Sequence, residues 1–299
     1  ITGHHEEEEE PHDEEEEEHE EETENYSFSS NNVSFAIDLC RPINDNWDLN
    51  FGYSSVERAP SVVELFMNGP HLATGRFETG DVNLATETSN NIDIAISYES
   101  DNFYATATIF RNDVDNYVYL MDMHHDEDDH DDLMGVMSED DDDDGHPHGE
   151  GLIEANYMQQ NAELDGYELE IGRIFNLDNG DLEVSFGRDV VNGTLADGMN
   201  IPRLSPARNI YSVKYFANDY LFDLSFKDVD DQTDLAEEET PTMGYQMLDT
   251  KVVKTFDLNG NSLRVSVFAN NLLDEVARNH SSFVKNQVPL PGRNYGIRF

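Results

Sequence analysis

The feature that most constrains this chain is a period-2 alternation of apolar and polar residues, repeated in segment after segment. In VSFAIDLC, for example, Phe35, Ile37 and Leu39 alternate with Ala36 and Asp38. Successive side chains of a strand point to opposite faces of a sheet, so this period indicates strands that face two different media. Eleven strands are predicted, at about 31–41, 46–58, 87–98, 103–121, 154–175, 181–192, 208–216, 220–231, 243–256, 262–272 and 292–299.

The connections between these strands alternate strictly in length. The short ones are PINDN, ESDN, NLDNG, AND and DLNGN, and the long ones are 59–86, 122–153, 193–207, 232–242 and 273–291. In an up-and-down antiparallel sheet, this order places every tight turn at one end and every long loop at the other. That asymmetry is typical of outer-membrane β-barrels, which have short periplasmic turns and long extracellular loops.

A soluble β-sandwich is the alternative, because its strands also alternate. Two features favour the barrel. Segments such as 103–121 and 154–175 exceed the roughly 3 to 10 residues of strands in globular proteins, and tyrosines crowd the strand ends as in an aromatic girdle. We therefore expect an all-β, antiparallel, up-and-down transmembrane β-barrel with long acidic loops at one end.

The last residues, RNYGIRF, add a second sign of a barrel. Tyr295, Ile297 and Phe299 share one face of the final strand. A terminal aromatic residue preceded by apolar residues at alternate positions resembles the C-terminal strand by which outer-membrane barrels are recognised. We therefore expect the barrel assembly machinery to recognise Phe299.

Several stretches together resemble TonB-dependent outer-membrane receptors. SSVERAPSVVELFMNGPHLATGRFETGDVNL contains an ERAPS-type motif followed by NGPHLAT and GDVNL, and FANNLLDEVARNHSSFVKNQVPLPGRNYGIRF contains NNLLD, PGRN and the terminal phenylalanine. The resemblance covers most of residues 46–299 and is specific as a set. It implies a barrel of about 22 strands around an N-terminal plug, in the lipid of the outer membrane of a Gram-negative bacterium, working with the TonB system.

Eleven strands are about half of such a barrel, so residues 26–299 resemble its C-terminal half. Residues 1–25 are expected to be the truncated start of the chain, an acidic, histidine-rich extracellular loop. The sequence contains no plug and no TonB box, so the TonB system would act through the missing plug. Half a barrel would also leave open sheet edges that lipid does not tolerate.

The charge of the chain is extreme and unevenly distributed. The formal net charge of −48 excludes a general affinity for nucleic acid or for anionic lipid headgroups. Residues 1–24 contain 15 acids and residues 119–152 contain 14, and together they hold nine of the eleven histidines. Solvated, disordered acidic loops would explain the acids, but they would not require imidazole.

Imidazole and carboxylate groups together suit zinc, whereas calcium and magnesium prefer oxygen ligands alone. The stretch DDDDDGHPHGEG does not match a calcium-binding EF-hand loop, because Gly151 occupies the last position of the loop, where glutamate is required. We therefore expect both histidine-rich runs to capture Zn²⁺. The candidate ligands are His124, His125, Asp126, His130, His146 and His148 in loop 122–153, and His4, His5, His12 and His19 in residues 1–25.

An ordered metal site is expected deeper in the loops, with His71 of NGPHLATG as the first candidate. Glu78 and Asp81 follow within reach along the chain. The alternative for His71 is an ordinary hydrogen-bonded loop histidine. His280 in ARNHSSF is a weaker candidate of the same kind.

No motif indicates an enzyme or an organic cofactor, because no nucleophile elbow, phosphate loop or dinucleotide fingerprint occurs. Within the family that the sequence resembles, receptors with such histidine- and aspartate-rich loops look like the zinc-uptake type, and the sequence is interpreted as one of these. Two alternatives remain open. One is a receptor for a siderophore, haem, copper or nickel, and the other is a non-transporting acidic surface protein that binds calcium or a partner.

Overall fold

The computed structural model describes residues 29–123 and 151–299. Asn32–Phe299 forms one compact unit, which is almost entirely β-structure. The predicted ligands of residues 1–25, together with Asp126 and the five histidines of loop 122–153, lie outside the described residues. Their assignment to zinc therefore stays a prediction.

All eleven predicted strands are present, and each begins and ends within four residues of its predicted bounds. Each strand is hydrogen-bonded to the next in chain order, and every pair on this path is antiparallel. The strands are β1 (Phe35–Asn44), β2 (Trp47–Arg58), β5 (Glu87–Ser100), β6 (Phe103–Asp122), β7 (Ile153–Leu177), β8 (Gly180–Leu195), β9 (Arg208–Ala217), β10 (Tyr220–Val229), β11 (Tyr245–Leu258), β12 (Asn261–Asn270) and β13 (Asn294–Arg298).

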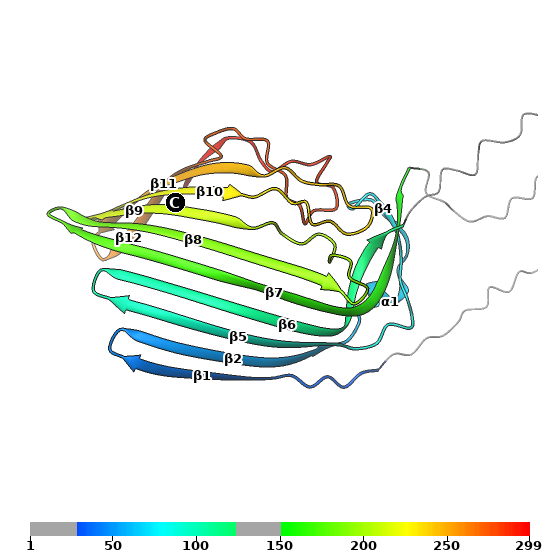
Figure 1. Ribbon diagram of the computed structural model, residues 1–299. Helices are drawn as coiled ribbons and strands as arrows, with labels where there is room; N and C mark the ends of the chain where they lie inside the picture. The colour runs from blue at the N-terminus through cyan, green and yellow to red at the C-terminus, as the bar shows by residue number, and fades with distance from the viewer. Residues whose placement is uncertain (1–28, 124–150) are drawn as a thin grey trace, which may run out of the picture. The chain divides into compact units, whose positions relative to one another are not determined.

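The tight turns and the long loops lie at opposite ends of the sheet, as the connection lengths predict (Figure 1). Asn218 and Asn259 adopt positive φ angles of 51° and 52° in two of the tight turns. Two-residue hairpin turns need this backbone conformation, and asparagine tolerates it better than most residues. The short connections are thus encoded locally.

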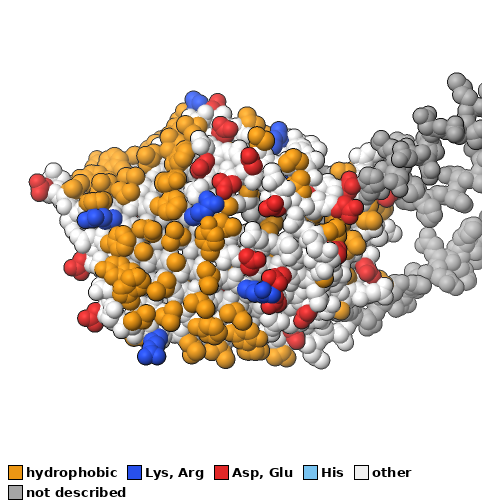
Figure 2. All heavy atoms as spheres, in the orientation of Figure 1, with side chains coloured by type: hydrophobic (Ala, Val, Ile, Leu, Met, Phe, Trp, Pro, Cys, Tyr) orange, Lys and Arg blue, Asp and Glu red, His pale blue; other side chains and the backbone are white. Residues whose placement is uncertain are grey.

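One face of the sheet is apolar and exposed, and the other carries charged pairs. Ile37, Leu39 and Ile109 are 53%, 61% and 60% exposed, and Figure 2 shows hydrophobic side chains gathered in a band nearer the tight turns. On the opposite face, Lys251 Nζ lies 3.1 Å from Asp223 Oδ2. No helix within the described ranges is long and apolar enough to cross a membrane.

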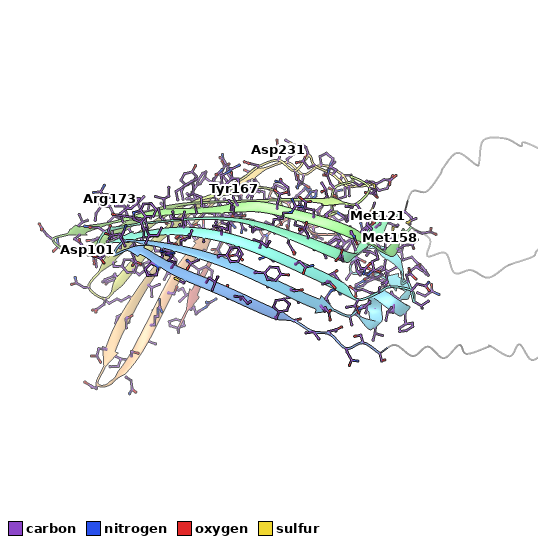
Figure 3. All side chains as sticks on the ribbon, turned by 60° about the horizontal axis from the view of Figure 1, so that its bottom comes forward. Asp101, Met121, Met158, Tyr167, Arg173 and Asp231 are labelled. Carbon is purple, nitrogen blue, oxygen red and sulfur yellow. The ribbon has the colours of Figure 1, made fainter. Side chains whose placement is uncertain are left out.

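The sheet is curved but open over the described residues, because β1 and β13 each have only one neighbouring strand (Figures 1 and 3). This is the arrangement expected of part of a barrel, with its two edges available to further strands.

The segment 59–86 is not the plain loop that the sequence predicts. It contains α1 (Val62–Phe66), β3 (Asn68–His71) and β4 (Arg76–Thr79). Ser61 and Glu64 form a reciprocal capping box at the start of α1. The elements escaped prediction because four or five residues are too few to reveal a period.

The loop-end part of the β6–β7 hairpin is covered on both faces. Residues 118–121 of β6 are all buried, although alternate side chains of a strand point to opposite sides. Leu65 and Leu84 pack with Val118 on one side. Leu195 and Ile201 pack with Tyr119 and Met121 on the other. Two connecting segments therefore fold back onto this hairpin.

Candidate metal-binding site

The β3–β4 hairpin brings His71 and Glu78 together, as the sequence analysis expected. The two strands pair antiparallel, and His71 Nδ1 lies 2.8 Å from Glu78 Oε1. Thr74 Oγ1 donates to the same oxygen at 2.9 Å, and the Tyr157 hydroxyl donates to Oε2 at 3.3 Å. Glu78 is 2% exposed, whereas the His71 side chain is 48% exposed.

This geometry gives the two residues different roles. The histidine tautomer that donates its Nδ1–H to the Glu78 carboxylate keeps its lone pair on Nε2. Histidines that bind metals usually donate their other ring N–H to a carboxylate or carbonyl in this way. His71 is therefore suited to bind a metal through Nε2. Glu78 is placed to orient the ring, and its role as a second ligand stays a prediction.

Asp81 does not join this pair. Its Oδ1 accepts hydrogen bonds from the backbone N–H of Asn83 at 2.8 Å and from the Asn83 amide at 2.9 Å. The Asp81 backbone N–H donates to the carbonyl of Glu64. Within residues 29–123 and 151–299, no group of three or more histidine, cysteine, aspartate or glutamate side chains is placed to hold a metal.

His280 is a structural histidine, because it is buried and its acceptor nitrogen already has hydrogen-bond partners. The residue is 1% exposed, and its Nδ1 lies 2.8 Å from Thr242 Oγ1 and 3.2 Å from Lys285 Nζ. An ammonium group only donates, so Nδ1 accepts and Nε2 carries the hydrogen. Nε2 faces Glu239 Oε1 at 3.6 Å. The weaker candidate is thus the hydrogen-bonded loop histidine of the alternative reading.

Four residues from different segments at the long-loop end form what we call the loop clasp: Arg76, Asp122, Arg203 and Phe283. The guanidinium carbons of Arg76 and Arg203 lie 4.6 and 4.1 Å from the centre of the Phe283 ring. Arg76 Nε donates to Asp122 Oδ1 at 2.6 Å, and Arg203 donates to the carbonyl of Leu120. The clasp joins β4, the end of β6 and the segments 196–207 and 271–293. No sequence signal indicated it.

Glu239 extends these contacts to the segment 230–244. It accepts hydrogen bonds from the backbone N–H of Arg203 at 2.7 Å and of Ala236 at 3.1 Å. Burial pushes the pKa of Glu239 upward, but the His280 imidazole and these N–H groups outweigh burial and hold the pKa below its usual range. Glu239 is therefore a carboxylate at neutral pH.

The basic side chains of the described long loops are few, and each is bonded to the protein. These loops contain twelve acids and five basic residues. Their partners are Asp122 for Arg76, the Leu120 carbonyl for Arg203, the Lys285 and Asn286 carbonyls for Arg278, the Thr240 carbonyl for Lys285, and Asp274 for Arg293. Burial lowers the pKa of Lys285 as well. The described part of the loop end therefore carries more acids than bases, and each of its basic side chains already has a hydrogen-bond or ion-pair partner.

Comparison with known proteins gives a family match and a set of similar folds. Residues 16–272 match the family described as TonB dependent receptor-like, beta-barrel. The fold is similar to the copper transporter OprC, with a TM-score of 0.66 and 17% sequence identity. It is also similar to the siderophore receptor PirA from Pseudomonas aeruginosa (TM-score 0.54, 16% identity) and to the FrpB iron transporter from Neisseria meningitidis (0.57, 14%).

Each of these comparisons covers 88% of this chain but only 38% to 41% of the other protein. The chain therefore spans well under half the length of the solved structures that it matches. At these identities, the likeness establishes the fold.

Proposed function

The chain belongs to the TonB-dependent receptor β-barrel family, and from this premise we propose that it is the part of a receptor that captures a metal ion for uptake, with zinc as the expected ion. Members of the family are transporters rather than enzymes, and they lie in the outer membrane of Gram-negative bacteria. The division into an acidic, histidine-rich loop, 1–25, and a half-barrel, 26–299, belongs to the proposal.

The observation that carries the proposal is the orientation of His71 by the buried Glu78. An imidazole whose Nδ1 is held by a carboxylate offers Nε2 as a ligand for zinc and related transition metals. The charge of the described loops supports a cation as the cargo, because an anionic metal chelate would need free basic side chains. The twelve acids would instead raise the local concentration of divalent cations.

In the proposed mechanism, the acidic loops gather divalent cations and the histidines select a transition metal over calcium. His4, His5, His12, His19, His124, His125, His130, His146 and His148, with Asp126, are the proposed capture residues, and His71 is the ordered ligand behind them. Release into the periplasm would require the plug and the TonB system. Phe299 would direct the barrel to its assembly machinery.

A second candidate is a receptor for another metal or for a metal chelate. The names of the similar structures support it, since they include a copper transporter, a siderophore receptor and an iron transporter. Copper and nickel bind the same imidazole ligands. A siderophore or haem receptor fits less well, because the described loops present no free basic group.

The test is a calorimetric titration of the full-length receptor, plug included, with Zn²⁺ in the presence of excess Ca²⁺. Three proteins are compared: the natural protein, a variant with the five histidines of loop 122–153 changed to alanine, and His71→Ala. We expect each variant to bind zinc more weakly. Equal zinc affinity in all three, or displacement of zinc by calcium, would refute capture by these histidines. Tighter binding of Cu²⁺ or Ni²⁺ than the general affinity order predicts would favour the second candidate.

A further inference from the structure

Basic side chains are rare on the apolar face of the sheet, and they occur at its two borders. Arg111 and Arg188 lie on the side of the long loops. Arg41, Arg173 and Lys254 lie on the side of the tight turns, four or five residues before the turns that follow β1, β7 and β11. Alternation places each of them on the face of the apolar residues, as with Leu39 before Arg41, Ile171 before Arg173 and Val252 before Lys254.

The arginines at the long-loop border are neutralised by carboxylates. Arg111 Nη2 lies 3.0 Å from Asp113 Oδ1 and 2.6 Å from Glu163 Oε2. Arg188 Nη2 lies 3.2 Å from Asp230 Oδ2. This border therefore has no unpaired positive charge to offer a ligand.

The three residues at the tight-turn border have no carboxylate partner within residues 29–123 and 151–299, and two of them rest on aromatic rings. Arg173 lies 5.0 Å from the centre of the Phe175 ring. Lys254 Nζ lies 4.1 Å from the centre of the Tyr220 ring and donates to its hydroxyl at 2.6 Å. Such stacking holds the cation at the surface while the aliphatic stem covers apolar area. Figure 2 shows Lys and Arg side chains at this edge of the hydrophobic band, and Figure 3 shows Arg173 nearer the turns than Tyr167 of the same strand.

We propose that Arg41, Arg173 and Lys254 form a basic border that binds the phosphate groups of anionic phospholipids. Tight turns of outer-membrane barrels face the periplasm, so this border meets the headgroups of the inner leaflet. Lys and Arg side chains near an anionic membrane surface attract its lipids. The net charge of −48 predicts no general affinity for anionic headgroups. The local border differs because no carboxylate of the described chain is paired with it.

Native mass spectrometry of the detergent-solubilised full-length receptor tests this proposal. The protein is titrated with phosphatidylglycerol and, separately, with phosphatidylethanolamine carrying the same acyl chains. We expect the natural protein to retain more phosphatidylglycerol. Removing one such charge weakens binding about fivefold, so Arg41→Gln/Arg173→Gln/Lys254→Gln should weaken phosphatidylglycerol binding on the order of 100-fold. Binding of phosphatidylethanolamine should change much less.

The matched control is Arg111→Gln/Arg188→Gln, which removes two basic residues from the other border of the same face. It should keep the preference for phosphatidylglycerol. An equal loss in both variants, or no preference in the natural protein, overturns the proposal. Should the triple variant not fold, two other measurements decide. Arg41→Lys/Arg173→Lys/Lys254→Arg must keep the preference, and added salt must reduce it in the natural protein.

Discussion

At the scale of single residues, the pair His71 and Glu78 shows how a buried carboxylate prepares an exposed imidazole. Glu78 Oε1 lies 2.8 Å from His71 Nδ1, and Nε2 is on the other side of the imidazole ring. The seven-residue spacing made contact between them plausible from sequence. The spacing could not reveal that Glu78 is 2% exposed, whereas the side chain of His71 is 48% exposed. Burial is what divides their roles.

Glu78→Gln is predicted to weaken zinc binding at His71 about 10- to 100-fold, the usual effect of losing a carboxylate that orients a metal-binding histidine. The neutral amide no longer favours the tautomer with the hydrogen on Nδ1. Calorimetry on the full-length receptor measures the change. Asp81→Asn is the control, because the Asp81 side chain accepts hydrogen bonds from Asn83 alone, and an equal effect of both substitutions would contradict the role given to Glu78.

Glu239 is predicted to make the packing of the loop end depend on pH. Its folded-state pKa lies below the usual value of 4.5, so its contribution is complete above about pH 4.5. The contribution is lost as the pH falls through the folded-state pKa. At pH 7, Glu239→Gln should cost about 1.5–3 kcal/mol of local stability, as for hydrogen bonds to a charged group.

Amide exchange of Arg203 and Ala236, whose N–H groups bond to Glu239, measures this local stability. The difference between the natural protein and Glu239→Gln should shrink between pH 5 and pH 3. A difference that grows as the pH falls would contradict the lowered pKa.

At the scale of elements, the long connections are not independent loops. The loop-end part of the β6–β7 hairpin is buried on both faces, by α1 on one side and by residues near Ile201 on the other. The loop clasp then joins β4 to a segment 207 residues away, where Arg76 also donates to the carbonyl of Phe283. The β3–β4 hairpin that carries His71 is thereby tied to the rest of the loop end.

Phe283→Leu is predicted to lower the local stability of both β4 and residues 196–207. Leucine keeps most of the apolar volume but removes the ring that both guanidinium groups contact, at about 0.5–2 kcal/mol for each contact. Amide exchange should accelerate in β4 and in residues 196–207 at once. Phe175→Leu, which removes the ring beneath Arg173 near a tight turn, should leave both segments unchanged. Faster exchange confined to residues 271–293 would show that the clasp does not couple them.

At the scale of the whole molecule, the two faces of the sheet meet different surroundings. The apolar band on one face and the polar side chains on the other follow from the same period of two. The described long loops contain twelve acids and five basic residues, and the basic border, whose side chains form no ion pair with a described carboxylate, lies near the turns. The molecule is therefore asymmetric both across the sheet and along its strands.

Leu224→Arg is predicted to destabilise the barrel by about 2–4 kcal/mol, the cost of an arginine on the lipid face near the middle of the membrane. Ser225→Arg is the control, because this next residue of β10 lines a hollow on the opposite face that also includes Asp223 and Asp249. Denaturant unfolding of the full-length receptor in lipid vesicles compares the two. Equal destabilisation would argue against lipid contact on the apolar face.

Local patterns determined much of this protein. The eleven strands, the ends at which their connections lie and the apolar face could all be predicted from sequence, because alternation and turn residues act over a few neighbouring positions. The family could also be recognised from ERAPS, NNLLD and PGRN. The contact of His71 with Glu78 was within reach because both belong to one short segment.

Only the tertiary structure decided which side chains of the long connections meet. The tertiary structure gives His71 and the buried His280 different surroundings and places Glu78 where it orients the His71 ring. It also brings Arg76 and Arg203 onto the ring of Phe283. The short elements α1, β3 and β4 also depend on packing against β6 and β7. Such contacts join residues far apart in sequence, so they arise from how the connections fold back over the sheet and leave no periodic trace in the chain.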